Sequence, residues 1–169
     1  KILLCAECGQ ITPRRLTQNS ANDSSPRWSP DGRVLYFLST RSGSSQVWRL
    51  QLAGGEATQV TDYPRDIGAL KIAPSGSRIA VTMEVLPDCD PLCTRERFRT
   101  KEKQKNTGRT FDRTFIRHWD TWSDGTRSHL FVATVGTDGR AGAPVDVAKT
   151  LDADVPSKPF GADEEFTFT

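Results

Sequence analysis

The chain has 169 residues, of which 36% are hydrophobic, 8% aromatic and 26% charged. Its 23 Lys and Arg residues nearly balance 21 Asp and Glu residues, and the net charge of +2 argues against binding to nucleic acid or to an anionic membrane. No apolar run approaches the ~18–20 residues that a membrane-spanning helix needs, so we expect no membrane span.

Two stretches of the chain repeat each other. Residues 25–33 read SPRWSPDGR and residues 68–76 read GALKIAPSG, and their prolines at 30 and 74 lie 44 residues apart. The threonines at 17 and 61 have the same spacing. Repeats of roughly 40–50 residues made of short strands are typical of propeller blades, each a four-stranded sheet. The repeat therefore predicts an all-β fold, a partial β-propeller of about three four-stranded blades, within a ring that typically has 4–8.

Residues 1–17 read as the outer strands of a preceding blade, and residues 18–61 as a complete propeller blade. A polar loop at 18–25 opens that blade, and a turn follows in which Gly32 supplies a positive φ. The β-branched and aromatic run VLYFLS and the alternating run QVWRLQL are typical of strands. We expect the four strands of this blade at 27–29, 34–39, 46–52 and 58–61.

Residues 62–150 read as a second blade with a long insertion at about 85–128. Its strands are expected at 70–72, 78–84, 129–135 and 145–147. Within the insertion, Thr94 is the expected N-cap of a short charged helix over 95–105. Residues 151–169 read as a linker followed by the first strand of a further blade, at 166–169.

The cysteines are spaced as two close pairs, Cys5 with Cys8 and Cys89 with Cys93. A zinc site would need the two pairs within ~15–20 residues of each other, whereas 81 separate Cys8 from Cys89, so we expect neither metal nor cofactor. A Cys89–Cys93 disulfide is the favoured interpretation, contributing on the order of 2 kcal/mol. It would indicate a periplasmic or secreted location, the cytoplasm being the alternative.

An unusual aromatic and charged cluster lies in the insertion. It comprises Arg117, Trp119, Asp120 and Trp122. Aromatic and Arg side chains make good anchors, so these residues are candidates for contact with a substrate or an interface. The alternative, which we favour on the sequence alone, is that alternate residues pack the insertion back onto the blade while Asp120 caps a turn.

Catalytic chemistry is not expected from this chain itself. His118 and His129 are its only histidines. A histidine acts as general base on a nucleophilic serine, and the sequence contains no Gly-x-Ser-x-Gly elbow that would supply one. Packing or solvent-facing roles are expected for both. The basic stretch over 95–109 is interrupted by Glu96 and Glu102 and would spread its charges around a helix, which favours a solvated segment over a nucleic-acid site.

The blade pattern resembles that of two families. Leu-Thr, Pro-x-Trp-Ser-Pro-Asp-Gly-Arg, Ser-Thr-Arg-Ser-Gly and Gly-Gly-Glu occur in this order over residues 16–56. They resemble the amino-terminal propeller of prolyl-oligopeptidase-family serine peptidases of the dipeptidyl and acylaminoacyl type, and the propeller of the Tol-Pal translocation protein. Residues 117–125 (RHWDTWSDG) and 154–161 (DVPSKPFG) resemble bacterial peptidases of the first family.

The first resemblance implies a non-catalytic, substrate-gating propeller region in a serine peptidase, as a fragment without the catalytic domain. Its partners would be a peptide substrate and the α/β-hydrolase domain of the same full-length chain. Assembly into a homo-oligomer is a further possibility that the sequence leaves open. The full-length parent would then be a hydrolase, while this chain alone would not. The second resemblance implies a non-enzymatic, protein-binding propeller.

Overall fold

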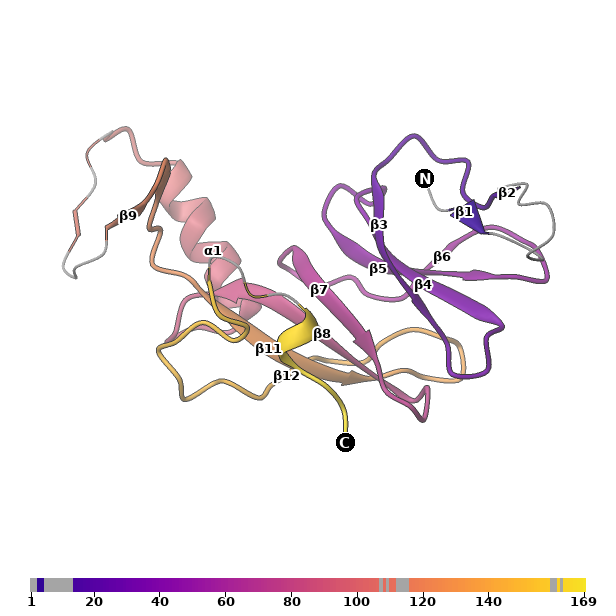
Figure 1. Cartoon of the computed structure of the whole chain (residues 1–169). Coiled ribbons are helices and arrows are strands. Elements are labelled where there is room, and N and C mark those ends of the chain that lie inside the picture. Colours follow the sequence, from indigo (N-terminus) through magenta and orange to yellow (C-terminus); the bar gives the residue numbers. More distant parts are fainter. Residues whose placement is uncertain are drawn as a thin grey trace.

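The computed structural model describes residues 3–4, 14–106, 108, 110–111, 116–158, 161 and 163–169 (Figure 1). Most of its regular structure is antiparallel strand. A short hairpin, β1 (Leu3–Leu4) with β2 (Arg14–Arg15), comes first. Two four-stranded sheets follow it.

The two sheets have the same simple topology. The first is ordered β3-β4-β5-β6, from β3 (Asp23–Trp28), β4 (Val34–Ser39), β5 (Gln46–Gln51) and β6 (Thr58–Gln59). The second is ordered β7-β8-β11-β12, from β7 (Ile67–Ile72), β8 (Arg78–Val85), β11 (Arg127–Thr134) and β12 (Val145–Asp146). Consecutive antiparallel strands in repeated four-stranded sheets are the architecture of propeller blades, so the predicted fold class, a partial propeller, is confirmed.

The sequence repeat is also a repeat of backbone conformation. Gly32 and Gly76, 44 residues apart, have φ of 68° and 71°, as the turn after each first strand requires. The amide of Gly32 donates to the carbonyl of Ser29 at 2.9 Å, and that of Gly76 to Ala73 at 2.8 Å. Each first strand thus turns into the second strand of its sheet in the same way.

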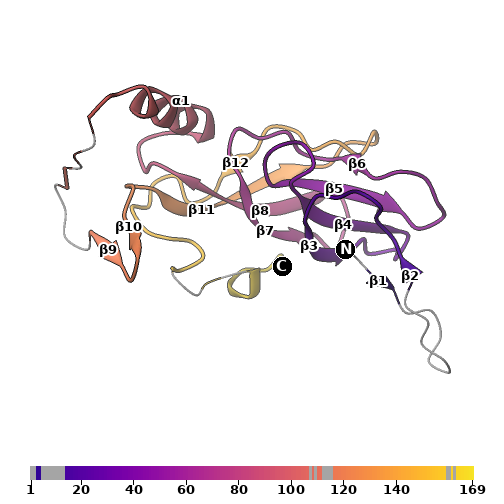
Figure 2. The ribbon, with the colours of Figure 1, turned by 90° about the horizontal axis from the view of Figure 1, so that it is seen from above.

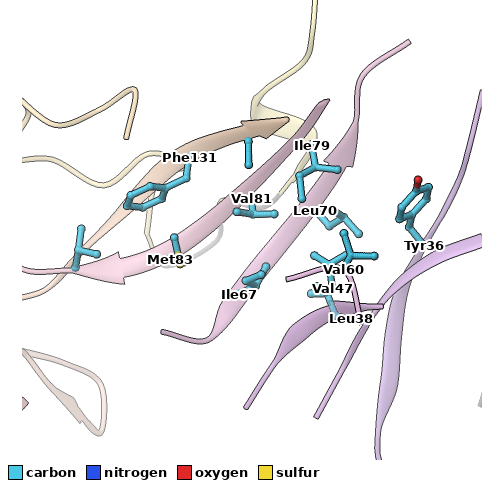
Figure 3. Packing of buried hydrophobic residues seen from close by; sticks show 12 residues of the cluster. Tyr36, Leu38, Val47, Val60, Ile67, Leu70, Ile79, Val81, Met83 and Phe131 are labelled. Carbon is cyan, nitrogen blue, oxygen red and sulfur yellow. The ribbon is translucent and has the colours of Figure 1, made fainter. Parts of the chain in front are cut away.

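The main hydrophobic core lies between the two sheets, where their faces pack together (Figure 3). Leu38 and Val47 of the first sheet meet Leu70 and Val81 of the second there. A second buried cluster on the other face of the first sheet contains Leu35, Phe37 and Leu50. The first sheet is therefore apolar on both faces, as a blade between two neighbours should be, which explains why the run VLYFLS does not alternate.

Strand bounds differ from the expected ones mainly at the first strand of each sheet. β3 begins at Asp23, inside the predicted loop, and β7 begins at Ile67. Both strands contain an irregularity that shifts their register, between Ser24 and Arg27 and between Ile67 and Leu70. A bulge breaks the alternation that sequence reasoning relies on, and the earlier half of each strand was missed for that reason.

The predicted helix bounds were wrong. Helix α1 spans Pro91–Glu102, its N-cap is Asp90, and the Asp90 carboxylate accepts the amide of Cys93 at 2.7 Å. Asp at the N-cap followed by Pro at the first helical position is a stronger start signal than the later Thr94. Thr94 is instead buried inside the helix, and its hydroxyl accepts the amide of Leu86 at 3.1 Å.

Residues 163–169 lie beside the second sheet. Residues 166–169 do not form a strand in the structure, and a short 3-10 turn, η1 (Asp163–Glu165), precedes them. This segment instead crosses near β7, where the Lys71 ammonium donates to the carbonyl of Phe166. The expectation that these residues open a further blade stays a prediction, because the strands they would pair with are not among residues 1–169.

Candidate functional site: an aromatic hairpin on a helical arm

The insertion forms an arm, which we define as residues 86–126. It leaves the second sheet at the end of β8 and returns at the start of β11, and these two strands pair continuously from Arg127↔Val85 to Thr134↔Arg78. The arm therefore replaces the turn of a β-hairpin without disturbing the sheet. In two perpendicular views it projects away from both sheets (Figures 1 and 2).

The outgoing side of the arm is fixed to the second sheet through α1. Cys89 and Cys93 form a disulfide across the first turn of this helix, with their Cα atoms 5.4 Å apart. Further along, the guanidinium of Arg65 lies over the ring of Phe98 at 5.1 Å, while its Nε donates to the carbonyl of Glu84 at 2.9 Å. The helix thus has a defined orientation relative to the end of β8.

Charged groups surround the point where the arm returns to the second sheet. Lys158 pairs with Glu84 and, at 3.3 Å, with Asp154. The hydroxyl of Thr126 lies 3.0 Å from Glu84 Oε2 and 2.7 Å from Asp124 Oδ1. Burial raises the pKa of Asp124, but hydrogen bonds from Thr126 and the charge of Lys158 outweigh it, so its pKa lies below the ordinary value.

The distal part of the arm is a two-stranded hairpin, β9 (Arg117–His118) with β10 (Thr121–Trp122). Trp122 pairs with Arg117 across the ladder. The turn between the strands contains Trp119, with a φ of 49°, and Asp120, which lies 3.3 Å from the hydroxyl of Thr121. All four sequence-predicted contact residues therefore lie on one small hairpin.

Aromatic surface is exposed on this hairpin. Trp119 and Trp122 are 75% and 44% exposed. The Arg117 guanidinium lies over the Trp122 ring at 5.3 Å, and the Phe111 ring stacks on the same indole at 5.7 Å. The ribbon of the hairpin lies away from the two four-stranded sheets (Figure 2).

His129 has a structural environment. It is 1% exposed on β11, with Nδ1 2.8 Å from the Asp146 carboxylate and Nε2 3.0 Å from the carbonyl of Leu151. Neither neighbour is a nucleophile, and the contacts join β11 to β12 and to the segment after it. The side chain of His118, like the residues Cys5 and Cys8, lies outside the part of the chain that the structure describes.

Sequence reasoning missed a pocket where the edges of the two sheets meet. β3 and β7 are edge strands that contact each other, and a pocket of about 250 Å³ lies beside them. Its lining residues are Arg27, Trp28, Lys71, Ile72, Pro74, Thr167 and Phe168. A signal was available in the repeat, because Arg27 and Lys71 are 44 residues apart, as are Trp28 and Ile72.

Among the described residues, none of the helices has the length and apolar character required to cross a bilayer.

The sequence profile of the family described as "TolB beta propeller domain" matches residues 3–147. Dipeptidyl-peptidase 5 of Porphyromonas endodontalis is 26% identical over 160 residues, covering 92% of this chain and 22% of that protein. The uncharacterized peptidase YuxL of Bacillus subtilis is 39% identical over 70 residues, covering 41% and 11%. The Tol-Pal system protein TolB of Francisella tularensis is 32% identical over 68 residues, covering 40% and 16%. The chain thus spans about a tenth to a fifth of the length of these relatives.

Proposed function

Because the chain belongs to the family of TolB β-propeller domains, we propose that it is a non-catalytic propeller region that gates peptide access to the α/β-hydrolase domain of a serine peptidase. The observation that carries the proposal is the extent of the match to dipeptidyl-peptidase 5, which covers 92% of the chain and so includes the arm. The match to the Tol-Pal system protein covers 40%. The arm thus lies within the region matched to the peptidase relative, which favours the gating role.

The geometry suits gating in two ways. Blades packed face to face through a buried core form a rigid wall, which excludes folded proteins and admits short or extended peptides. The arm adds exposed Trp119 and Trp122, with the Arg117 guanidinium over the Trp122 ring, and such groups are well suited to anchor a peptide or the neighbouring hydrolase domain. The parent protein would then belong to the prolyl-oligopeptidase family of hydrolases.

The proposed location is the periplasm or the cell exterior. The support is the Cys89–Cys93 disulfide, because such bonds form and persist in oxidising compartments. Labelling the free thiols of protein taken directly from cells tests this. Alkylation of both cysteines without prior reduction would contradict an oxidising location and favour the cytoplasm.

The peptidase assignment is tested by treating the full-length protein with a fluorophosphonate probe and sequencing the labelled peptide. A labelled serine within Gly-x-Ser-x-Gly, outside residues 1–169, is the expected result. A folded protein that takes no label would contradict the proposal.

The role of the hairpin is tested by steady-state kinetics on a panel of peptides. Trp119→Ala, Trp122→Ala and Asp120→Ala should change kcat/KM unequally among peptides while the melting temperature stays close to that of the parent. Lys103→Ala, an exposed change at the end of α1, is the matched control on the arm. Equal effects on every peptide would exclude a role of the hairpin in selectivity.

The second candidate is a protein-binding propeller without enzymatic activity. The exposed aromatic hairpin favours it, because rigid aromatic side chains surrounded by polar groups are typical of protein interfaces. Absence of fluorophosphonate labelling together with a measured loss of affinity for a purified partner in Trp119→Ala would establish this alternative.

A further inference from the structure

Two cations occupy equivalent positions on the edge strands that meet between the sheets. Arg27 is the penultimate residue of β3 and Lys71 the penultimate residue of β7. The residues that end these strands, Trp28 and Ile72, are equivalent in the same way. All four line the same pocket of about 250 Å³, so consecutive repeats contribute a cation and an apolar side chain each to one site.

This site already holds a carboxylate of the chain itself. Arg27 Nη2 lies 2.6 Å from Asp163 Oδ2, and Arg27 Nε donates to the carbonyl of Leu70 at 3.1 Å, which fixes the guanidinium against β7. The Lys71 ammonium donates to the carbonyl of Phe166 and lies 5.4 Å from the ring of that residue. The two cations thus hold one carboxylate and one carbonyl of a segment that is not part of either sheet.

The contact with Asp163 is a weak one. The side chains of Arg27 and Asp163 are 29% and 28% exposed, and ion pairs in contact with water contribute little because solvent screens them. Another carboxylate can therefore compete for the same guanidinium. Beside the cations, Trp28 is 47% exposed, so an apolar surface also remains open to a ligand.

We propose that Arg27 and Lys71 form a binding site for an acidic peptide, which displaces Asp163 and places an adjacent apolar side chain against Trp28 and Ile72. The present occupant supports a peptide, because one short segment of the chain offers the Asp163 carboxylate, the Phe166 carbonyl and the aromatic rings of Phe166 and Phe168. Charge complementarity gives the site its preference for acidic over neutral peptides. The site is separate from the aromatic hairpin.

The test measures fluorescence anisotropy of fluorescein-labelled Gly-Glu-Glu-Phe with the full-length protein. Pretreatment with a fluorophosphonate prevents any hydrolysis of the probe. Lys71→Gln and Arg27→Gln should each raise Kd about tenfold, the loss of one charge-assisted hydrogen bond. Asp163→Asn should lower Kd, because it removes the competing carboxylate. Arg33→Gln, an exposed cation on the turn after β3, is the control and should leave Kd unchanged.

Two further measurements make the result decisive. The amidated peptide Gly-Gln-Gln-Phe should not compete, and raising NaCl from about 0.05 M to about 0.5 M should weaken binding of the acidic probe. Equal binding of the neutral peptide would overturn the proposal, and so would stronger competition by inorganic phosphate than by free glutamate, which would indicate a general anion site.

Misfolding of a variant does not obscure the outcome. Arg27 also donates a hydrogen bond to the carbonyl of Leu70, so Arg27→Gln is interpreted only if the variant melts at the temperature of the parent. If it does not, the conclusion is drawn from Lys71→Gln. A gain of affinity in Asp163→Asn cannot come from misfolding, and its absence together with an unchanged Kd in Lys71→Gln would refute the site. Because the readout is binding alone, such a failure leaves the gating proposal untouched.

Discussion

Arg41 and Asp23 form a buried ion pair inside the first sheet. Arg41 Nη2 lies 2.8 Å from Oδ1 and 3.0 Å from Oδ2 of Asp23, and the two side chains are 9% and 1% exposed. The guanidinium also lies over the rings of Phe37 and Trp48, at 5.2 Å and 4.9 Å. The pair joins the start of β3 to the turn after β4, and both charges are largely shielded from water.

The Asp23 carboxyl should make stability depend on acid pH. Burial raises its pKa, but hydrogen bonds from Ser39 and Arg41 outweigh burial, so the folded-state pKa lies below the ordinary value of 3.8. A group with a lowered folded-state pKa stabilises above its unfolded pKa, and this stabilisation is lost as pH falls through the folded pKa. Denaturant unfolding at a series of pH values measures it.

Asp23→Asn removes one partner of the pair and should cost about 3–5 kcal/mol at neutral pH, because the Arg41 charge stays buried. The difference between parent and variant should shrink below about pH 3.9. Asp88→Asn, which affects the exposed pair with Arg97, is the control and should change little. A difference that is constant with pH would contradict the assignment.

Gly32→Val should lower stability by about 1–3 kcal/mol, because a β-branched residue is strained at the φ of 68° found there. No atom lies within 4 Å of the position of an added Cβ, so the effect would come from the backbone alone. Gly108→Val also meets no neighbour and has no positive φ, which makes it the matched control. Thermal melting compares the two, and equal melting temperatures would disprove the turn.

His129→Phe tests whether this histidine acts through its hydrogen bonds or its volume. Phenylalanine fills the site but leaves the Asp146 carboxylate and the Leu151 carbonyl without their imidazole partner, at a cost of about 1–3 kcal/mol for a buried polar group left unsatisfied. Val145→Ala, on the neighbouring strand and 64% exposed, should change stability little. A His129→Phe variant as stable as the parent would show that packing alone matters.

Removing the disulfide should loosen the start of α1 more than the sheets. Cys89→Ser combined with Cys93→Ser should lower global stability by about 2 kcal/mol on the chain-entropy account of a short loop. Amide exchange should rise over the first turn of α1 and remain slow in β8 and β11. Faster exchange throughout both sheets would mean that the arm contributes to the core.

The repeat made the fold predictable, because the positions of Gly32 and Gly76 are set by local turn chemistry and recur at a fixed spacing. β4 was predicted at its observed bounds for the same reason, since a buried strand needs β-branched and aromatic residues along its whole length. The hairpin was located by its composition. The exposure of the hairpin could not be predicted, because the sequence pattern does not tell whether a surface packs against the same chain or against another molecule.

Contacts between residues far apart in the sequence were beyond sequence reasoning. Lys158 reaches Glu84 across 74 positions, and Lys71 reaches Phe166 across 95. Single charges of this kind occur at many positions without any partner, so composition carries no signal for them. The placement of residues 163–169 beside β7 depends on such contacts.

The uninterrupted pairing of β8 with β11 makes the arm an exchangeable module. The conformational entropy lost on closing a connection grows only slowly with its length, so a long segment can replace a tight turn at a small cost. Related chains are therefore free to lengthen, shorten or replace this segment while their blades stay the same. A two-residue Asn-Gly turn in place of residues 86–126 should leave the second sheet intact. An arm taken from a relative and inserted at the same place should transfer the peptide selectivity of that relative to this protein.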